Sequence, residues 1–174
     1  MKFKTTIILF AIFIVLLAFV LLFEFKGKGK KDEGEKLLAL SSDDVQKITL
    51  KKEDETIIFQ KNEEGEWLIT EPLEAKADKY EVDRLASDFS DLKIERLVEE
   101  EPEELKKYGI PQKEINLWFK DKDEPIKILI GMENPLDQTF FAKRDDETRV
   151  VLIPSNLKSL MEKSLFEFSG EEYL

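Results

Sequence analysis

The chain has 174 residues, no histidine, no cysteine and a formal net charge of −11. Without cysteine it forms no disulfide and no thiolate metal site, and without histidine it lacks the commonest general base and the commonest transition-metal ligand. A negative charge of this size repels phosphate backbones, so we expect no binding to nucleic acid.

The first element along the chain is an unbroken apolar run, IILFAIFIVLLAFVLLF, which extends from Ile7 through Leu16 to Phe23. With the two threonines before it, residues 5–23 would form a helix about 28 Å long, close to the ~30 Å thickness of a bilayer's hydrocarbon core. A helix that is apolar on every side is typical of a membrane span, and the following EFKGKGKKDEGE offers no small-residue signal-peptidase site. We therefore predict an uncleaved anchor in residues 1–25, held in the lipid bilayer through residues 5–23.

Residues 26–36 (KGKGKKDEGEK) contain only glycine, lysine and acids, which predicts a flexible tether before a domain at residues 37–174. Two lysines precede the anchor and four follow it, so the positive-inside rule by itself leans toward a cytoplasmic domain. A short basic tail before an N-terminal anchor is nevertheless the usual layout of a signal anchor, and long domains cross membranes largely regardless of charge. We favour a single-pass protein of the inner (cytoplasmic) membrane whose domain lies outside the cytoplasm.

The first half of the domain is predicted to be a β-meander followed by a helix. Alternating segments rich in β-branched residues, separated by charged or glycine-containing turns, are Val45–Leu50, Thr56–Gln60 and Glu66–Thr70. Asp78 precedes Glu81 by three residues, as in a capping box, so it is better explained as a helix N-cap than as a catalytic acid. The apolar face of the helix that follows consists of Val82, Leu85, Ala86, Phe89 and Leu92. Ile94–Val98 then returns as a strand, and a short helix lies between Pro102 and Gly109.

The second half repeats this order. Its predicted strands are Ile115–Phe119, Ile126–Ile130, Thr139–Lys143 and Arg149–Ile153. A closing helix capped by Ser155 is expected to have an apolar face made of Leu157, Leu160, Met161 and Leu165. The first strands of the two halves lie 70 residues apart, which is compatible with duplication of a meander–helix unit. We predict an α+β fold of antiparallel β-meanders with covering helices, in one domain or in two tandem lobes at residues 40–100 and 101–174.

Several turn and strand residues have structural explanations. Trp67 and Trp118 lie in strand patterns and are expected to pack in or beside the core. Gly109 fits the left-handed residue after a helix, and Pro111 prevents that helix from continuing. Gly131 is expected to provide a turn with positive φ at the end of a strand.

No residue pattern indicates catalysis, a cofactor or a metal. A Ser-His-Asp triad is impossible without histidine, and no glycine-rich phosphate-binding loop is present. The acidic clusters at Glu99–Glu104, Asp121–Glu124 and Asp145–Glu147 lack the alternating spacing and central glycine of a calcium loop, and acids are ordinary at such turns. We therefore assign no catalytic, cofactor-binding or metal-binding residue.

Three motifs occur in a fixed order along the domain. The first is a Trp-x-Ile-x-x-Pro segment that leads to Ala-Asp before a helix, the second a Tyr-Gly-Leu-like step before a proline, and the third an Ile-Gly that ends a strand. They consist of Trp67, Ile69, Pro72, Ala77 and Asp78, then Tyr108, Gly109, Ile110 and Pro111, and finally Ile130 and Gly131. In this order they resemble the bacterial family named domain of unknown function 4340, although that family often has Asp before the proline of the second motif.

The resemblance spans essentially the whole chain and implies an N-terminally anchored, extracytoplasmic bacterial protein. Some members resemble auxiliary parts of gliding-motility-type ABC transport systems, which makes ABC transporter subunits the implied membrane-protein partners. The family implies no catalytic residue.

Two function classes follow from the sequence. The first is a non-catalytic accessory or interaction domain of the cell envelope, anchored in the membrane. The second is an envelope ligand- or polysaccharide-binding domain, provided that aromatic residues such as Phe140, Phe141 or Trp118 are exposed. An enzyme of unfamiliar carboxylate chemistry is a distant third.

Overall fold

The computed structural model describes residue 13 and residues 34–170. The predicted anchor at residues 1–25, apart from Phe13, and most of the predicted tether lie outside the described residues. In the described part of the chain, no helix is long and apolar enough to cross a membrane. The chain divides into two units, Met1–Glu33 and Gly34–Leu174, and the account below concerns the second.

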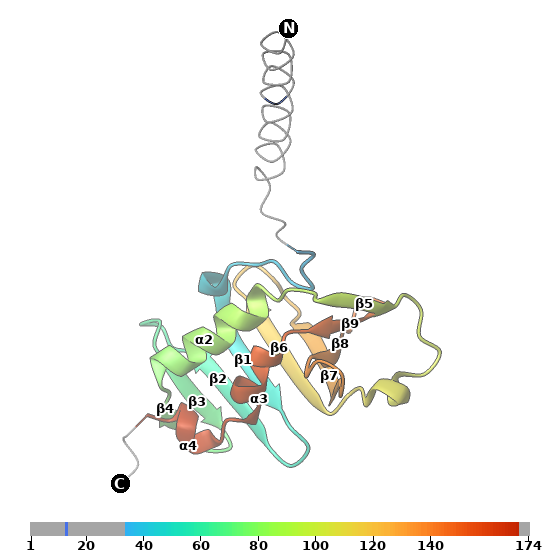
Figure 1. Ribbon diagram of the computed structural model, residues 1–174. Coiled ribbons are helices and arrows are strands. Elements are labelled where there is room, and N and C mark those ends of the chain that lie inside the picture. Colours follow the sequence, from blue (N-terminus) through green and yellow to red (C-terminus); the bar gives the residue numbers. More distant parts are fainter. Residues whose placement is uncertain (1–12, 14–33, 171–174) are drawn as a thin grey trace, which may run out of the picture. The chain divides into compact units, whose positions relative to one another are not determined.

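Nine antiparallel strands form one sheet in the order β4-β3-β2-β1-β6-β7-β8-β9-β5 (Figure 1). The strands are Val45–Lys51 (β1), Thr56–Lys61 (β2), Trp67–Glu71 (β3), Ala75–Lys76 (β4), Arg96–Glu99 (β5), Lys113–Phe119 (β6), Ile126–Glu133 (β7), Phe140–Arg144 (β8) and Val150–Ile153 (β9). The α-helices are Lys79–Ser90 (α2), Lys158–Glu162 (α3) and Leu165–Phe168 (α4), and the 3₁₀ helices are Ser42–Asp44 (η1), Leu105–Tyr108 (η2) and Ser155–Leu157 (η3). The predicted α+β fold with antiparallel meanders is confirmed.

The two halves of the chain meet at the centre of the sheet, where β1 pairs with β6. Ile48 lies opposite Leu117 and Leu50 lies opposite Ile115. All four side chains are fully buried. From this central pair, one half of the chain extends outward as β2 and β3 and the other as β7, β8 and β9. The halves therefore share one sheet and one core.

β5 joins the halves a second time, because it pairs with β9 at the far edge of the sheet and not with the meander that precedes it. Arg96 lies opposite Leu152, and Leu97 lies opposite Val151. Every residue of β9 is buried, so without β5 an entirely apolar strand would form the edge of the sheet. Residues 40–100 and 101–174 therefore do not form separate lobes.

The core lies between the sheet and helices α2, α3 and α4, which cover one face of it; we call this the helix face (Figure 1). α2 buries the predicted residues Val82, Leu85, Ala86 and Phe89, and α3 buries Leu160 and Met161. The rings of Phe59 on β2 and Phe168 on α4 meet edge to face, with centroids 5.0 Å apart. Burial of these apolar faces, more than helix propensity, holds the short helices in place.

The N-cap prediction for α2 is confirmed. The Asp78 carboxylate accepts a hydrogen bond from the backbone N–H of Glu81 at 3.1 Å. The reciprocal half of the expected capping box is replaced by an ion pair, because the Glu81 carboxylate lies 3.3 Å from Lys163 Nζ. The first turn of α2 is thereby connected to the C-terminal segment.

The predicted closing helix is broken into η3, α3 and α4, and the capping role expected of Ser155 is wrong. Ser155 is the first residue of η3 and makes no side-chain cap. The cap occurs instead at Ser164, which forms a complete capping box with Glu167 at the start of α4. The helix predicted after Pro102 is likewise shorter, since η2 begins only at Leu105.

The last residues of the predicted tether at 26–36 belong to the domain. The backbone N–H of Ile94 donates to the carbonyl of Glu35 at 2.8 Å, and the Glu35 carboxylate pairs with Arg149. Leu37 is 1% exposed, and its burial holds the preceding residues against the domain. The unit therefore begins three residues earlier than predicted.

We expect Asp78→Ala to lower the free energy of unfolding by about 1 kcal/mol, because the Glu81 N–H loses its acceptor. Urea denaturation of residues 34–174, followed by circular dichroism, measures the change. Asp123→Ala, in an exposed turn, is the matched control and should change stability by less than about 0.5 kcal/mol. Equal effects of the two substitutions would contradict the capping role.

Candidate functional site

The face of the sheet opposite the helices, which we call the second face, is covered only over β7, β8 and β9. There the connection between β5 and β6 packs on it, with the Tyr108 ring centroid 5.0 Å from that of Phe141. Ile110, Val150 and Leu152 are buried but lie outside the main core, as expected for a small cluster beneath this connection. Over β1, β2, β3 and β6, no helix of the described residues lies on the second face (Figure 1).

Gly131 lies where this connection crosses β7, and the positive φ predicted for it is wrong. Gly131 is inside the strand, and its φ lies outside the left-handed region. A Cβ at this position would overlap the carbonyl oxygen of Tyr108 and lie 2.7 Å from a side-chain carbon of Ile110. Glycine is required because two backbone segments touch, so the second and third sequence motifs form one structural contact.

The other residues of the second motif complete this crossing. Gly109 follows η2 with φ of 65°, as predicted for a left-handed helix end. The peptide bond before Pro111 is cis. Beyond it, the backbone N–H of Gln112 donates to the carbonyl of Ile130 at 2.8 Å. These residues lead the chain from the connection into β6.

An ionic contact fixes the same connection to β5. The Tyr108 hydroxyl donates to the Glu99 carboxylate, and Lys107 Nζ lies 2.6 Å from the same carboxylate. The hydrogen bonds from Lys107 and then Tyr108 lower the pKa of Glu99. Burial and the neighbouring Glu99 raise the pKa of Tyr108. Both shifts favour the forms already present at neutral pH, which fits a structural contact and not an acid–base pair.

The first motif surrounds Trp67, which is 2% exposed, so its predicted packing role is confirmed. Its indole N–H donates to Asp83 on α2 at 2.8 Å, and its carbonyl accepts from the N–H of Ala77 at 3.1 Å. Burial raises the pKa of Asp83, but hydrogen bonds from Lys79 and Trp67 outweigh it and leave the pKa lowered. The motif joins β3 and α2 through the turn that contains Pro72. The Asp83 carboxylate contributes to this connection by accepting the hydrogen bond from Trp67.

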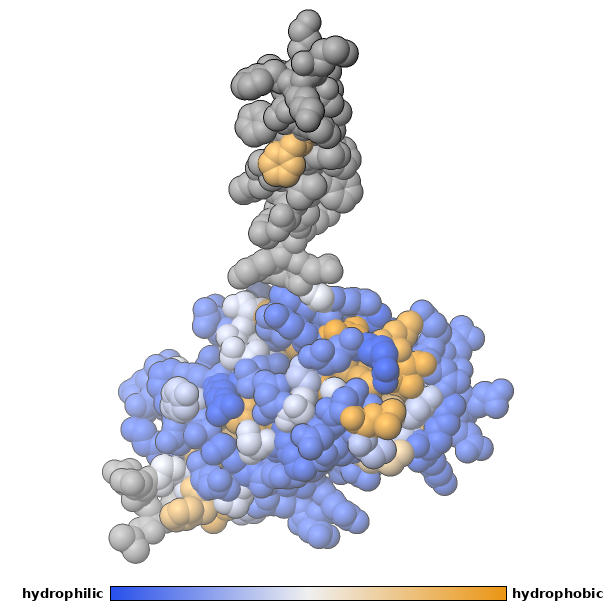
Figure 2. All heavy atoms as spheres, in the orientation of Figure 1, coloured by the Kyte–Doolittle hydropathy of each residue, from blue (hydrophilic) through white to orange (hydrophobic). Residues whose placement is uncertain are grey.

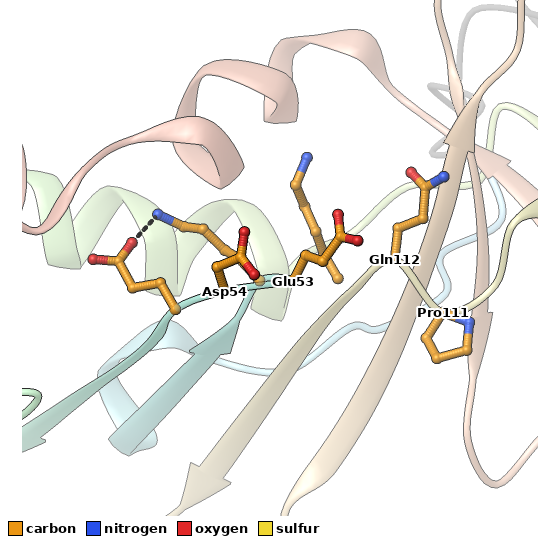
Figure 3. Close-up of a pocket in the computed structure, with 7 residues that line it drawn as sticks. Glu53, Asp54, Pro111 and Gln112 are labelled. Atoms are coloured by element: carbon orange, nitrogen blue, oxygen red, sulfur yellow. Dashed lines mark hydrogen bonds and ion pairs between the residues drawn. The ribbon is translucent and has the colours of Figure 1, made fainter.

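A hollow of about 680 Å³ lies between the β1–β2 turn and the start of β6 (Figure 3). Its lining residues are Lys52, Glu53, Asp54, Glu55, Pro111, Gln112 and Lys113. Lys52 Nζ pairs with Glu55 at 2.9 Å and also donates to the carbonyl of Lys163. The side chains of Glu53 and Gln112 point toward the same open space in Figure 3. The lining mixes both charges and holds no hydroxyl nucleophile, so the hollow is a polar recess without an evident chemistry.

The structure separates the three aromatic residues considered as ligand-binding candidates. Phe140 is 5% exposed and belongs to the main core, so its proposed exposure is wrong. Phe141 is half-buried beneath Tyr108. Trp118 is half-buried on the uncovered part of the second face, and Lys47 Nζ lies 5.0 Å from its ring centroid. Trp118 is therefore the one that remains a candidate.

The residues around Trp118 form a polar platform on β1 and β6. Lys47 lies opposite Trp118 and Thr49 opposite Asn116, and we call these four residues the Trp118 platform. Asn116 Nδ2 donates to Glu114 Oε1 at 2.8 Å, while Asn116 Oδ1 is buried and has no hydrogen-bond partner in the described structure. Asn116 was not predicted as a site residue. Its position between Ile115 and Leu117 does indicate that its side chain points to the face opposite the core.

In the 137-residue stretch 34–170 and at residue 13, no cluster of three or more acidic, histidine or cysteine side chains could hold a metal ion. The acidic side chains in the turn after β8 form ion pairs with nearby arginines. Arg144 pairs with Asp146 at 2.6 Å, and Arg149 pairs with Glu147 at 2.7 Å. The candidate surfaces are therefore the second face and the exposed apolar side chains, and not a charged pocket.

We expect Gly131→Ala to lower the free energy of unfolding by about 1–3 kcal/mol, because the new methyl group overlaps the Tyr108 backbone. Urea denaturation of residues 34–174 tests this, with Gly34→Ala as the control. A Cβ at Gly34 would meet only the Ile94 carbonyl at an ordinary 3.9 Å. If both substitutions changed stability equally, the close crossing would not be the reason for glycine at this position.

Comparison with known proteins gave one match. Residues 67–173 match the family described as Domain of unknown function (DUF4340). Searches of curated proteins and of solved structures found no match. The matched region begins at Trp67 and includes all three motifs. Because it covers more than half of the chain, the protein belongs to the DUF4340 family.

Proposed function

We propose that the protein is a membrane-anchored, non-catalytic accessory domain of the bacterial cell envelope that binds a membrane-protein partner. The anchor is residues 5–23, and the domain lies outside the cytoplasm. The partner class is the one implied by the family resemblance, namely the subunits of an ABC transport system. The sequence supports the non-catalytic part, because a chain without histidine and cysteine lacks the residues that most often serve as bases and nucleophiles.

The observation that carries this proposal is a group of exposed apolar side chains at the edge strand β5 and the β7–β8 turn. The core-facing residues of β8 and β9 are buried, so these exposed side chains belong to an edge strand and a turn and not to an open face of the sheet. Figure 2 shows hydrophobic residues gathered over β5, β7, β8 and β9. Leu97 on β5 is 41% exposed, and Leu136 in the β7–β8 turn is 87% exposed.

We define the apolar patch by these two leucines, Leu97 on β5 and Leu136 in the β7–β8 turn. Exposed apolar side chains grouped in this way on an otherwise charged surface are typical of protein-binding sites.

The alternative function, an envelope ligand- or polysaccharide-binding domain, is favoured by a different surface, the Trp118 platform. The two surfaces lie on opposite faces of the sheet, because Leu97 is opposite the core residue Val151 while Asn116 alternates with core residues. One protein can therefore use both.

The experiment is affinity isolation of the detergent-solubilised full-length protein, anchor included, from membranes of the source bacterium. We expect a membrane protein to be recovered with the unaltered chain. The double substitution Leu97→Glu and Leu136→Glu should reduce its recovery at least about tenfold, because two charges would enter an apolar contact.

Tyr80→Glu is the matched control, since Tyr80 is 72% exposed but lies on α2, away from the patch. It should leave recovery unchanged. Failure to recover any membrane protein above background would contradict the proposal. Equal recovery with the double variant and the unaltered chain would exclude the apolar patch as the contact.

A further inference from the structure

We propose that Leu136 is the central contact of the apolar patch, and that the partner protein receives its side chain in a leucine-sized apolar pocket. This inference rests on the proposed function, because it concerns the same partner. It adds which residue of the patch binds and which chemistry on the partner receives it. Three features of the β7–β8 turn carry the inference: its exposed tip, its internal hydrogen bonds and its backbone conformation.

The tip of the β7–β8 turn is apolar and exposed. The turn consists of residues 134–139 (NPLDQT), and Leu136 at its tip is 87% exposed. Four other turns between neighbouring strands consist mainly of charged residues, namely residues 52–55, 62–66, 120–125 and 145–149. A single exposed leucine is ordinary on a protein surface, so its meaning depends on how firmly the chain holds it.

Hydrogen bonds inside the turn hold Leu136 in place. Asn134 is 5% exposed; its Oδ1 accepts from the Leu136 N–H at 3.3 Å, and its Nδ2 donates to Asp137 Oδ1 at 2.8 Å. The same Asp137 oxygen accepts from the backbone N–H of Thr139 at 3.2 Å and from the Thr139 hydroxyl. The backbone closes the turn, because the Gln138 N–H donates to the Asn134 carbonyl at 3.0 Å. Asn and Asp side chains bonded to the local backbone in this way fix the conformation of a turn.

The backbone of the turn is held in a conformation that its residues rarely adopt. Gln138 has a φ of 61°, and no other non-glycine residue that the structure describes has a positive φ. This conformation is unfavourable for glutamine, so it persists only where the surrounding contacts impose it. The ring of Pro135 fixes φ on the other side of Leu136. A turn that is rigid before binding loses little conformational freedom on binding, which favours a role in recognition.

The chemistry of the turn fits a protein pocket better than a bilayer. Residues 134–139 contain no lysine, arginine or aromatic residue, which are the side chains that hold protein segments at a membrane surface. The hydrogen bond from the Thr139 hydroxyl lowers the pKa of Asp137, so the neighbour of Leu136 is charged at neutral pH. An apolar pocket can enclose the Leu136 side chain alone and leave the Asp137 carboxylate in water at its rim.

The test varies the size of the side chain at position 136 in the affinity isolation of the full-length protein from membranes. Leu136→Ala should lower recovery of the membrane partner at least about tenfold, because most of the buried apolar surface is lost. Leu136→Met has a similar volume and should keep recovery within about threefold. Leu136→Trp should lower it at least about tenfold, because the ring exceeds a leucine-sized pocket.

Leu73→Ala is the matched control. Leu73 also follows a proline in a turn between strands, it is 42% exposed, and its turn joins β3 to β4 at the opposite edge of the sheet. Its substitution should leave recovery unchanged. A loss equal to that of Leu136→Ala would overturn the assignment of Leu136 as the central contact.

Two substitutions at Asp137 test whether the turn positions Leu136. Asp137→Ala removes the acceptor for Asn134 and Thr139 and should lower recovery about three- to tenfold, with the melting temperature of the protein unchanged. Asp137→Asn keeps an acceptor oxygen at the same place and should retain recovery within about twofold. Equal losses in the two variants would show that the charge of Asp137 matters and not the geometry of the turn, and would overturn its positioning role.

The outcomes separate this inference from the proposed function. Failure to recover any membrane protein with the unaltered chain would contradict both. Recovery that falls with Leu97→Glu but not with Leu136→Ala would leave the proposed function intact and overturn the role of Leu136. Recovery that falls with Leu136→Ala but is kept by Leu136→Trp would overturn the leucine-sized pocket, since tryptophan is favoured at a bilayer surface.

Discussion

The pairing of β1 with β6 determines where both halves of the chain can lie, because each of these strands has an apolar side that must be buried. Ile48 and Leu50 on β1 meet Leu117 and Ile115 on β6, and each pair removes apolar surface that either half alone would expose. Once the strands are joined, the meanders can only extend outward, and β5 is left to protect the edge beside β9. The same register places Lys47 beside Trp118 on the opposite side of the sheet.

The connection between β5 and β6 divides the second face into a covered and an open half. It must return from the edge of the sheet to the centre, and it does so across β7, β8 and β9. Gly131 permits this path, because only glycine lets the Tyr108 backbone touch the strand. The path ends at the first residue of β6, so no helix within residues 34–170 lies on this face of β1, β2, β3 and β6 (Figure 1). The open polar face is therefore a consequence of the chain's topology.

Local features of the fold could be predicted from the sequence, whereas long-range contacts could not. The alternation in Val45–Leu50 and Ile115–Phe119 predicts strands because strand side chains point to opposite faces at every second position. Asp78 is predictable as an N-cap because the cap and the N–H it accepts from are three residues apart. The position of β5, the docking of Glu35 and the burial of Phe140 depend on partners far along the chain, and no local pattern contains that information.

The candidate surfaces show the same division. Trp118 was recognisable as an aromatic residue in a strand, but its pairing with Lys47 required the β1–β6 register. Asn116 was not singled out in the sequence, and its place on the face opposite the core is clear only because Ile115 and Leu117 are core residues. Gly131 was predicted to form a turn with positive φ. In the sequence, a glycine needed for this reason looks the same as a glycine needed because a distant backbone segment packs against it.

The central claim is that the two halves are one cooperative body joined through β1 and β6. Native-state hydrogen exchange on residues 34–174 tests it most directly. The account predicts that the amides of the central strands, including Ile48 and Leu117, exchange only through global unfolding, with the same free energy in both halves. Slow exchange in one half combined with opening of the other at a free energy lower by several kcal/mol would show two independent lobes and contradict it.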